Sequence, residues 1–416
     1  MKIITPSQFN TFSEFTNLDI PIVKTILKDV QKNKDSAVKK YTKRFDKLNL
    51  KNLEISKQEI KQAYKQVDKK TIAALKIAAK NITFFAKKQL ANTKEFELKN
   101  KGITLGQKII PIENLGCYVP GGRYPLPSSA LMSIIPAKVA GVKNIVVCSP
   151  KIAPVTIVAA DLSGANQIFN VGGAQAIASL AFGTETIPKV DKIVGPGNKF
   201  VAAAKKEIFG IVGIDFIAGP SELLIIADDS ANPEYIAADL LAQAEHDPDA
   251  IVNVLTCSKL LGTQINTQLK KQLQCLSTKE VAKQSLKKGS IIIVKSIDET
   301  ISLSNKIAPE HLELMIKNPN KIIPKLKNYG SLFIGDDSAE VFGDYCSGTN
   351  HILPTNYASK YTGSLSPLDF VKIVTFQKIN KKNKKAVKNL IKVSSTLAEV
   401  EGLDAHKKAA EIRELS

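Results

Sequence analysis

Tryptophan is absent from this chain of 416 residues, and methionine, histidine and cysteine are rare, with 3, 4 and 5 copies. The five cysteines are odd in number and widely spaced, and no two of them form a C-x-x-C pair. We therefore expect neither a disulfide framework nor a cysteine-based zinc finger, and interpret the thiols as small apolar core groups. The length and an apolar content of 44% predict two or more globular domains.

Arginine is also nearly missing, although the formal net charge is +19. Of the 58 lysines and arginines only Arg44, Arg123 and Arg413 are arginine, and the lysines are spread along the chain. Arginine is the usual reader of phosphate and guanine, because its planar group donates two hydrogen bonds at once. We therefore expect no nucleic-acid partner, and interpret the lysine-rich run at 378–392 as a solvated helix face.

Long apolar runs are missing as well. No stretch approaches the roughly 18 apolar residues that a membrane-spanning helix needs, so we expect no membrane partner. The first 25 residues mix Glu14 and Asp19 with scattered phenylalanine and proline, unlike a signal or transit peptide. The sequence thus predicts a cytoplasmic protein.

Hydrophobic spacing divides the chain into helical ends and a centre of alternating strands and helices. Apolar residues recur at intervals of three and four over the first 95 residues, and residues 96–110 alternate like a hairpin. From Gly116 on, short apolar runs, glycine turns and helical segments follow one another, which predicts parallel sheets covered on both faces. We expect an α/β protein with two Rossmann-like parallel-sheet domains. The expected limits are 1–114 for a helical extension with a β-hairpin, 115–235 and 236–375 for the two α/β domains, and 376–416 for a C-terminal helical segment.

The four histidines all lie in the second half of the chain, each with a carboxylate or carboxamide nearby. Gln243 and His246 are three apart near the end of a helix that Asn232-Pro233 should begin, so they share one face. Asp344, which we place in a loop after a strand, and His406 would complete a set of nitrogen and oxygen ligands suited to zinc. Spacing alone leaves open the simpler alternative of a polar helix end, a loop aspartate and a surface histidine.

The dipeptide Glu310-His311 follows Ala308-Pro309, where proline should end a helix, so we expect the pair to open a new turn. A histidine with an ordinary pKa of ~6.5 can take a proton from a hydroxyl group at neutral pH. The adjacent glutamate could orient it or activate a water molecule. The alternative is a glutamate at a helix N-terminus that the helix dipole stabilises.

Three glycine turns follow predicted strands, and each could bind phosphate through backbone N–H groups at a helix N-terminus. They are Tyr118-Val-Pro-Gly-Gly122, Val171-Gly-Gly-Ala-Gln175 and Val194-Gly-Pro-Gly-Asn198. None is a complete G-x-G-x-x-G fingerprint, so each is weak evidence for a dinucleotide. Cys117 raises the rival hypothesis of a thiol that attacks an aldehyde, but no base lies close to it in sequence, and we prefer a core thiol.

Seven motifs, in this order and spacing, resemble histidinol dehydrogenase from about residue 100 to the C-terminus. They are Tyr118-Val-Pro-Gly-Gly, Gly195-Pro-Gly-Asn198, Ala218-Gly-Pro-Ser-Glu222, Gln243-Ala-Glu-His246, Ala308-Pro-Glu-His311, Gly343-Asp344 and Glu401-Gly-Leu-x-Ala-His406. The resemblance implies one zinc ion per subunit and a catalytic pair, Glu310 and His311. The implied zinc ligands are Gln243, His246, Asp344 and His406.

The same resemblance assigns positions to the cofactor and the substrate. It implies NAD contacts at Tyr118, Gln175 and Asn198. The implied substrate contacts are Ser221, Glu401 and His351, together with His311 and the four zinc ligands. The resemblance further implies a homodimer in which the C-terminal segment with Glu401 and His406 reaches the partner's active site.

Members of that family oxidise L-histidinol to L-histidine through L-histidinaldehyde with two NAD, the last step of histidine biosynthesis, and this is the activity we expect. Two other classes stay open from the sequence. A zinc hydrolase could use the same ligands without nicotinamide, and a basic binding protein could use the lysines and keep the histidines as scaffold.

Overall fold

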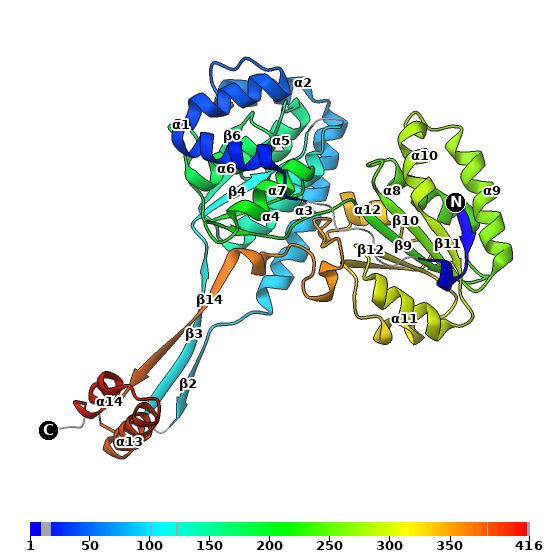
Figure 1. The fold of residues 1–416 in the computed structure, drawn as a ribbon. Helices are drawn as coiled ribbons and strands as arrows, with labels where there is room; N and C mark the ends of the chain where they lie inside the picture. Colours follow the sequence, from blue (N-terminus) through cyan, green and yellow to red (C-terminus); the bar gives the residue numbers. More distant parts are fainter. Residues whose placement is uncertain (10–17, 101, 122–123, 381, 414–416) are drawn as a thin grey trace.

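The computed structural model describes residues 1–9, 18–100, 102–121, 124–380 and 382–413. Gly122, the last glycine of the first predicted turn, and Lys101 in the predicted hairpin turn lie outside them. Within the described ranges, none of the helices has the length and apolar character needed to cross a membrane. Figure 1 shows two α/β units and a narrow arm that projects away from both.

The first unit contains a parallel five-stranded sheet in the order β6-β5-β4-β7-β8. Its strands are β4 (Asn114–Tyr118), β5 (Asn144–Cys148), β6 (Gln167–Phe169), β7 (Lys192–Val194) and β8 (Gly213–Ile214). Its helices are α4 (Pro127–Ala140), α5 (Pro154–Ser163), α6 (Gly173–Phe182) and α7 (Lys199–Ile208). The strand order reverses between β4 and β7, and ligands of open α/β sheets bind at the carboxyl ends of the strands at such a point.

The second unit contains a parallel six-stranded sheet in the order β1-β11-β10-β9-β12-β13. Its strands are β1 (Lys2–Ile4), β9 (Glu222–Ala227), β10 (Ile251–Thr256), β11 (Ser290–Ile293), β12 (His311–Met315) and β13 (Ser331–Ile334). Its helices are α8 (Pro233–Ala244), α9 (Lys259–Leu273), α10 (Lys279–Lys288), α11 (Ile297–Ile307) and α12 (Glu340–Tyr345). The prediction of two parallel sheets with helical extensions is confirmed.

The N-terminal helices cover the first unit. They are α1 (Pro21–Asp46), α2 (Lys57–Gln66) and α3 (Lys69–Ala91), which pack on α6, α5 and α4. Ser56 and Asp68 begin α2 and α3 by accepting hydrogen bonds from backbone N–H groups of the first turn. The apolar stripes of α2 and α3 join those of α4 and α5 in one buried cluster. This extension is therefore part of the core rather than an appendage.

The arm is a three-stranded antiparallel sheet that carries two helices at its far end (Figure 1). It consists of β2 (Phe96–Asn100), β3 (Ile103–Pro111), β14 (Val371–Ile379), α13 (Lys384–Val400) and α14 (Asp404–Glu411). The hairpin predicted for residues 96–110 is confirmed by β2 and β3. Its third strand, β14, comes from more than 250 residues later in the chain and pairs with β3 along its full length.

The domain limits remain a prediction, and sheet membership suggests how to refine them. Strand β9 pairs with β10 and β12, so we propose that the second unit begins near residue 220 rather than 236. Strand β1 joins the same sheet at its edge beside β11, far in sequence from its neighbours. Short 3-10 helices lie in the connections, at Pro6–Gln8, Pro319–Lys321, Ile323–Lys325, Ala358–Lys360 and Pro367–Phe370.

Candidate active site

A cavity of about 1340 Å³ opens between the two α/β units. On one side lie the residues at the carboxyl ends of β4 and β7, among them Tyr118 and Asn198. On the other side lie residues at the amino ends of β9 and β12, among them Ser221 and His311. The first sheet therefore faces the cavity with the carboxyl ends of its strands, and the second sheet with the amino ends. Only in the first unit do the carboxyl ends at the point where the strand order reverses face the cavity.

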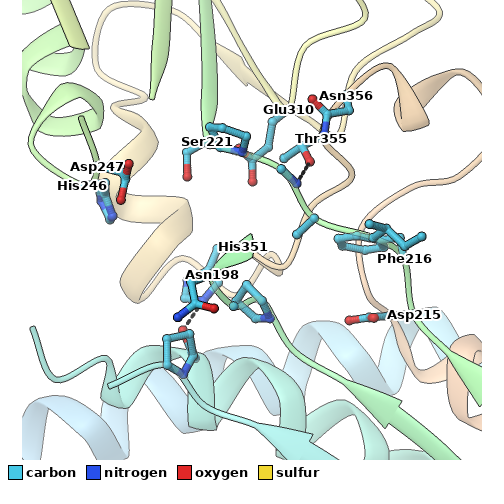
Figure 2. A pocket seen from close by; sticks show the side chains of 18 of the residues that line it. Asn198, Asp215, Phe216, Ser221, His246, Asp247, Glu310, His351, Thr355 and Asn356 are labelled. Atoms are coloured by element: carbon cyan, nitrogen blue, oxygen red, sulfur yellow. Dashed lines mark hydrogen bonds between the residues drawn. The ribbon is translucent and has the colours of Figure 1, made fainter. Parts of the chain in front are cut away.

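Nine of the residues proposed from the sequence line this cavity, although they are spread over more than 230 positions of the chain. They are Tyr118, Asn198, Ser221, Gln243, His246, Glu310, His311, Asp344 and His351. In Figure 2, Ser221, Glu310 and His246 are seen around the upper part of the open space, with Asn198 and His351 below them. The fold thus gathers three of the four predicted metal ligands, the catalytic pair and two of the three predicted NAD positions around one space.

Glu310 lies in a bend directly before β12 and His311 is the first residue of this strand, so the pair leads into a strand and the expected helical start is wrong. The Nδ1 atom of His311 lies 3.1 Å from the carbonyl oxygen of Glu222 and 3.7 Å from Oε2 of Glu310. Its Nε2 atom lies 3.3 Å from Oδ1 of Asp344. The ring also stacks on Phe333, with 5.9 Å between centroids. Both ring nitrogens are therefore engaged, and the orientation of the imidazole is fixed.

Both members of this pair titrate abnormally because of burial and of each other. Burial raises the pKa of Glu310 to about 8, against the pull of the neighbouring His311. Burial alone would lower the pKa of His311, but the carboxylates of Glu310 and Asp344 outweigh it and raise that pKa well above its ordinary value. Such shifted groups in a cleft are typical of acid–base sites.

Gln243 lies in the last turn of α8, as predicted, whereas His246 lies in the turn just beyond the helix, which ends at Ala244. Asn232 caps this helix by accepting a hydrogen bond from the backbone N–H of Glu234 at 2.9 Å, with proline at the next position. Gln243 is buried, yet its Oε1 atom has no hydrogen-bond partner among the described residues. A buried amide oxygen without a partner is costly, so this atom is suited to bind a group that the chain itself does not supply.

Asp344 lies in the short helix α12, so the expected loop after a strand is wrong. The helix starts from Ala339, and Glu340 anchors it by donating its backbone N–H to Glu313 on β12 at 3.0 Å. The carbonyl oxygen of Asp344 lies 2.7 Å from Nδ1 of His351, whose Nε2 lies 3.3 Å from Oγ of Ser129. Burial lowers the pKa of His351, so it stays neutral.

The wall on the side of the first unit is built around the turn after β7. Asn198 caps α7 by accepting from the backbone N–H groups of Phe200 and Val201. Gly195 has φ +110°, and a Cβ there would lie 2.0 Å from the carbonyl oxygen of Tyr118, so only glycine fits. Its N–H donates to Asp215, which forms a buried ion pair with Lys205 on α7.

Three sequence-predicted site residues lie elsewhere. Gln175 on α6 is only 1% exposed and sits behind the cavity wall, where Tyr118 accepts a hydrogen bond from the backbone N–H of Gly173. Glu401 and His406 are exposed on the arm, at the end of α13 and on α14. Figure 1 shows these helices far from both α/β units, so the chain does not bring the two residues to its own cavity.

Four buried carboxyl groups behind the cavity escaped the sequence reading. Asp239 and Glu340 precede Gln243 and Asp344 by one helical turn, Glu313 follows His311 by two residues, and Glu222 follows Ser221. Burial raises the pKa of Asp239 to about 6, of Glu222 to about 7 and of Glu313 to about 8. The sequence carried one signal for Asp239 and Glu340, because each lies one helical turn before a predicted ligand.

Cys117 is fully buried in β4, and burial raises the pKa of its thiol far above the ordinary value. A thiolate nucleophile is not formed under these conditions. The rival hypothesis of a cysteine that attacks an aldehyde is therefore disfavoured by the structure, and the core-thiol interpretation fits it.

Comparisons with known proteins agree with the resemblance found in the motifs. A model of the family described as histidinol dehydrogenase matches residues 13–414. The histidinol dehydrogenase of Methanocaldococcus jannaschii is 45% identical over 417 residues, covering 99% of this chain and 95% of that protein. That of Bacillus cereus is 47% identical over 396 residues, covering 94% and 91%.

The fold is shared as well. The crystal structure of histidinol dehydrogenase from Elizabethkingia anophelis matches with a TM-score of 0.91 and 42% sequence identity, covering 97% of this chain and 93% of that one. Similarity of sequence and fold thus extends over nearly the whole molecule. The chain belongs to the histidinol dehydrogenase family of oxidoreductases.

Proposed function

We propose that the chain oxidises L-histidinol to L-histidine through L-histidinaldehyde, with two NAD and one zinc ion per subunit. The observation that carries the proposal is the placement of the Glu310–His311 pair beside Gln243, His246 and Asp344 in one cavity. That cavity also opens onto the switch point of the first unit, where α/β proteins bind nucleotides.

The donor set fits zinc. Gln243 offers a buried amide oxygen without a partner, and Asp344 and His246 are close enough for their charges to interact. Among the described residues, however, no three His, Cys, Asp or Glu side chains group closely enough to hold a metal. Zinc takes four ligands, so this chain alone leaves the set incomplete. Bound there, zinc would orient the imidazole and amine of histidinol and offset the charge of Asp344 that raises the pKa of His311.

In the first oxidation, His311 takes the proton of the substrate hydroxyl while the C–H bond breaks and a hydride passes to NAD. The carbon–oxygen bond becomes double, which gives the aldehyde. The fixed orientation of the imidazole supports this role, because a general base must be aimed at the proton it removes. Retention of the aldehyde in the cavity would keep it from reacting in solution.

In the second oxidation, Glu310 activates a water molecule that adds to the aldehyde carbon and forms its hydrate. His311 then takes a hydroxyl proton of the hydrate while a second hydride passes to a second NAD, which yields the carboxylic acid. A carboxyl with a pKa near 8 supports this role, because it exchanges protons readily around neutral pH.

The wall of the first unit supports an NAD site on that side of the cavity. Tyr118 ends β4, and the turn from Gly195 to Asn198 ends at the N-terminus of α7, which is suited to phosphate groups. Gln175 lies behind this wall, so we propose that it supports the NAD site rather than facing the cavity.

The arm supports a homodimer in which each C-terminal segment completes the partner's site. Val393, Leu397 and Val400 form an exposed apolar stripe on α13, and Val400 is 81% exposed. Exposed apolar residues continue over the strands and at the two ends of α14; they are Phe96, Leu98, Leu105, Ile110, Ile373, Val374, Ile379, Leu403 and Ile412. A surface of this kind marks a protein interface. Docked on a second copy, the arm would bring His406 as a fourth zinc ligand and Glu401 as a substrate contact.

The proposed function is tested with the purified protein, histidinol and NAD, by following the absorbance of NADH and counting NADH per histidine. We expect two NADH per histidine. Glu310→Gln should stall the second oxidation more than the first, so that aldehyde accumulates in the enzyme. Equal slowing of both half-reactions would refute the separate role of Glu310. Hydrolysis without NADH would indicate the zinc hydrolase instead.

A further inference from the structure

Glu222 is the first residue of β9 and lies next to the catalytic pair. Its backbone N–H donates to Oε2 of Glu310 at 2.9 Å, and its carbonyl oxygen lies 3.1 Å from Nδ1 of His311. Its side-chain Oε1 accepts a hydrogen bond from the backbone N–H of Asn356 at 3.0 Å. One residue thus contacts both members of the pair through its main chain and a distant loop through its carboxyl.

The loop that it contacts has an unfavourable backbone conformation. Asn356 and Tyr357 have φ of 52° and 65°, the left-handed region, which is uncommon for residues other than glycine and unfavourable for a bulky residue such as tyrosine. Two hydrogen bonds hold this turn against residues 219–222: Asn356 to Glu222, and the N–H of Gly219 to Oγ1 of Thr355 at 2.6 Å (Figure 2). A Cβ on Gly219 would lie 2.1 Å from the side-chain nitrogen of Asn356, so the two segments are in close contact.

The main-chain contacts of Glu222 determine how the pair can act. An acceptor at Nδ1 of His311 favours a proton on that atom, so a proton taken from the substrate would be held at Nε2, which lies 3.3 Å from Oδ1 of Asp344. A donor at Oε2 of Glu310 leaves the other carboxyl oxygen to face water. The tautomer of His311 and the orientation of the Glu310 carboxyl both depend on the position of the peptide groups on either side of Glu222.

We propose that Glu222 is a positioning residue, whose carboxyl anchors the strained turn at 355–357 and thereby holds its own peptide groups against Glu310 and His311. The carboxyl acts as a hydrogen-bond acceptor, so glutamine can replace it. This role rests on the proposed oxidation of histidinol, because it concerns the same catalytic pair.

The test compares Glu222→Ala and Glu222→Gln with the wild type in the two-NADH assay. Loss of the acceptor frees the turn, so we expect Glu222→Ala to lower kcat about 10- to 100-fold with smaller changes in both KM values. Glu222→Gln should restore kcat to within about twofold of the wild type, because its amide oxygen still accepts from Asn356. Asp191→Ala is the matched control. Asp191 accepts a hydrogen bond from the backbone N–H of Asn114 at 2.9 Å, at the amino end of β4 and thus away from the cavity.

The pH profile supplies a second readout, which reports the charge of Glu222 beside Glu310 rather than the anchoring of the turn. The charge of Glu222 contributes to the raised pKa of Glu310. In Glu222→Gln this contribution is gone, so the limb of the kcat/KM profile that belongs to Glu310 should move to lower pH. If Glu222→Ala does not fold, Thr355→Val removes the other hydrogen bond of the turn and should lower kcat a few-fold with unchanged KM.

Three results would overturn the positioning role. They are unchanged kcat in the folded Glu222→Ala and Thr355→Val variants, a Glu222→Gln variant as impaired as Glu222→Ala, and an equal loss of kcat in Asp191→Ala. A wild type that forms no NADH from histidinol refutes the proposed function itself and the positioning role with it. The wild-type measurement therefore separates the two failures.

Discussion

The cavity and the arm differ in which side chains they bury and which they expose. Around the cavity, His311, Glu310 and Gln243 are buried; both ring nitrogens of His311 and Oε2 of Glu310 have partners within the chain, whereas Oε1 of Gln243 has none among the described residues. On the arm, large apolar side chains are exposed, and Glu401 and His406 project into solvent. The cavity has polar groups in need of a ligand, and the arm has apolar surface in need of cover. Both needs are met if the arm of one subunit docks on the cavity of another.

The largest expected effect comes from separating the two regions onto different subunits. His311→Asn and His406→Asn should each lower activity roughly 100- to 10,000-fold, because one removes the proposed base and the other a proposed metal ligand. A mixed dimer of one subunit of each kind should regain about half of the wild-type activity, since one site then combines an intact cavity with an intact arm. The measurement is NADH formation by differently tagged, co-purified subunits.

The pure variants serve as controls for this experiment, together with their zinc content. His406→Asn dimers should bind less zinc than His311→Asn dimers. A mixed dimer as inactive as its parents would place each arm at its own subunit's cavity. This result would contradict docking of each arm on the cavity of the other subunit.

A smaller effect is expected from the exposed stripe of α13. Leu397→Lys puts a charge on a side chain that is 58% exposed in the single chain and that we expect to be buried between subunits. The variant dimer should dissociate to monomers at a higher protein concentration than the wild-type dimer, which light scattering measures. It should lose activity in parallel. Ser394→Lys adds the same group at an exposed position beside the stripe and should leave the dimer intact. Equal behaviour of both variants would show that the stripe lies outside the interface.

The smallest effect concerns the buried carboxyls behind the cavity. Burial raises the pKa of Asp239 from 3.8 to about 6, so the folded protein keeps a proton that the unfolded chain loses. Stability should therefore fall as pH rises from about 4 to 6 and level off above. Asp239→Asn does not titrate, so its melting temperature relative to the wild type should rise over this window and then stay constant. A difference that is independent of pH between 4 and 7 would contradict the shifted pKa.

Local signals in the sequence predicted local structure well. Asn232-Pro233 marked the start of α8, and alternation over residues 96–110 marked the hairpin, because caps and pleats depend on neighbours in the chain. Tertiary pairing decided what local signals did not. His311 opens a buried strand, and β9 pairs within the second sheet, because pairing partners far along the chain decide both. The helix around Asp344 was missed because it is only six residues long.

The sequence alone determined the chemical inventory: which side chains can bind a metal, move a proton or begin a helix, since these properties belong to residue types and short spacings. Only the tertiary structure decided which of them meet. It aligned the carboxyl edge of one sheet with the amino edge of the other, gathered nine predicted residues around one cavity, and carried Glu401 and His406 away on an arm. The reason is that strand order and the direction of the arm arise from burial of apolar surface between distant segments, which no local pattern encodes.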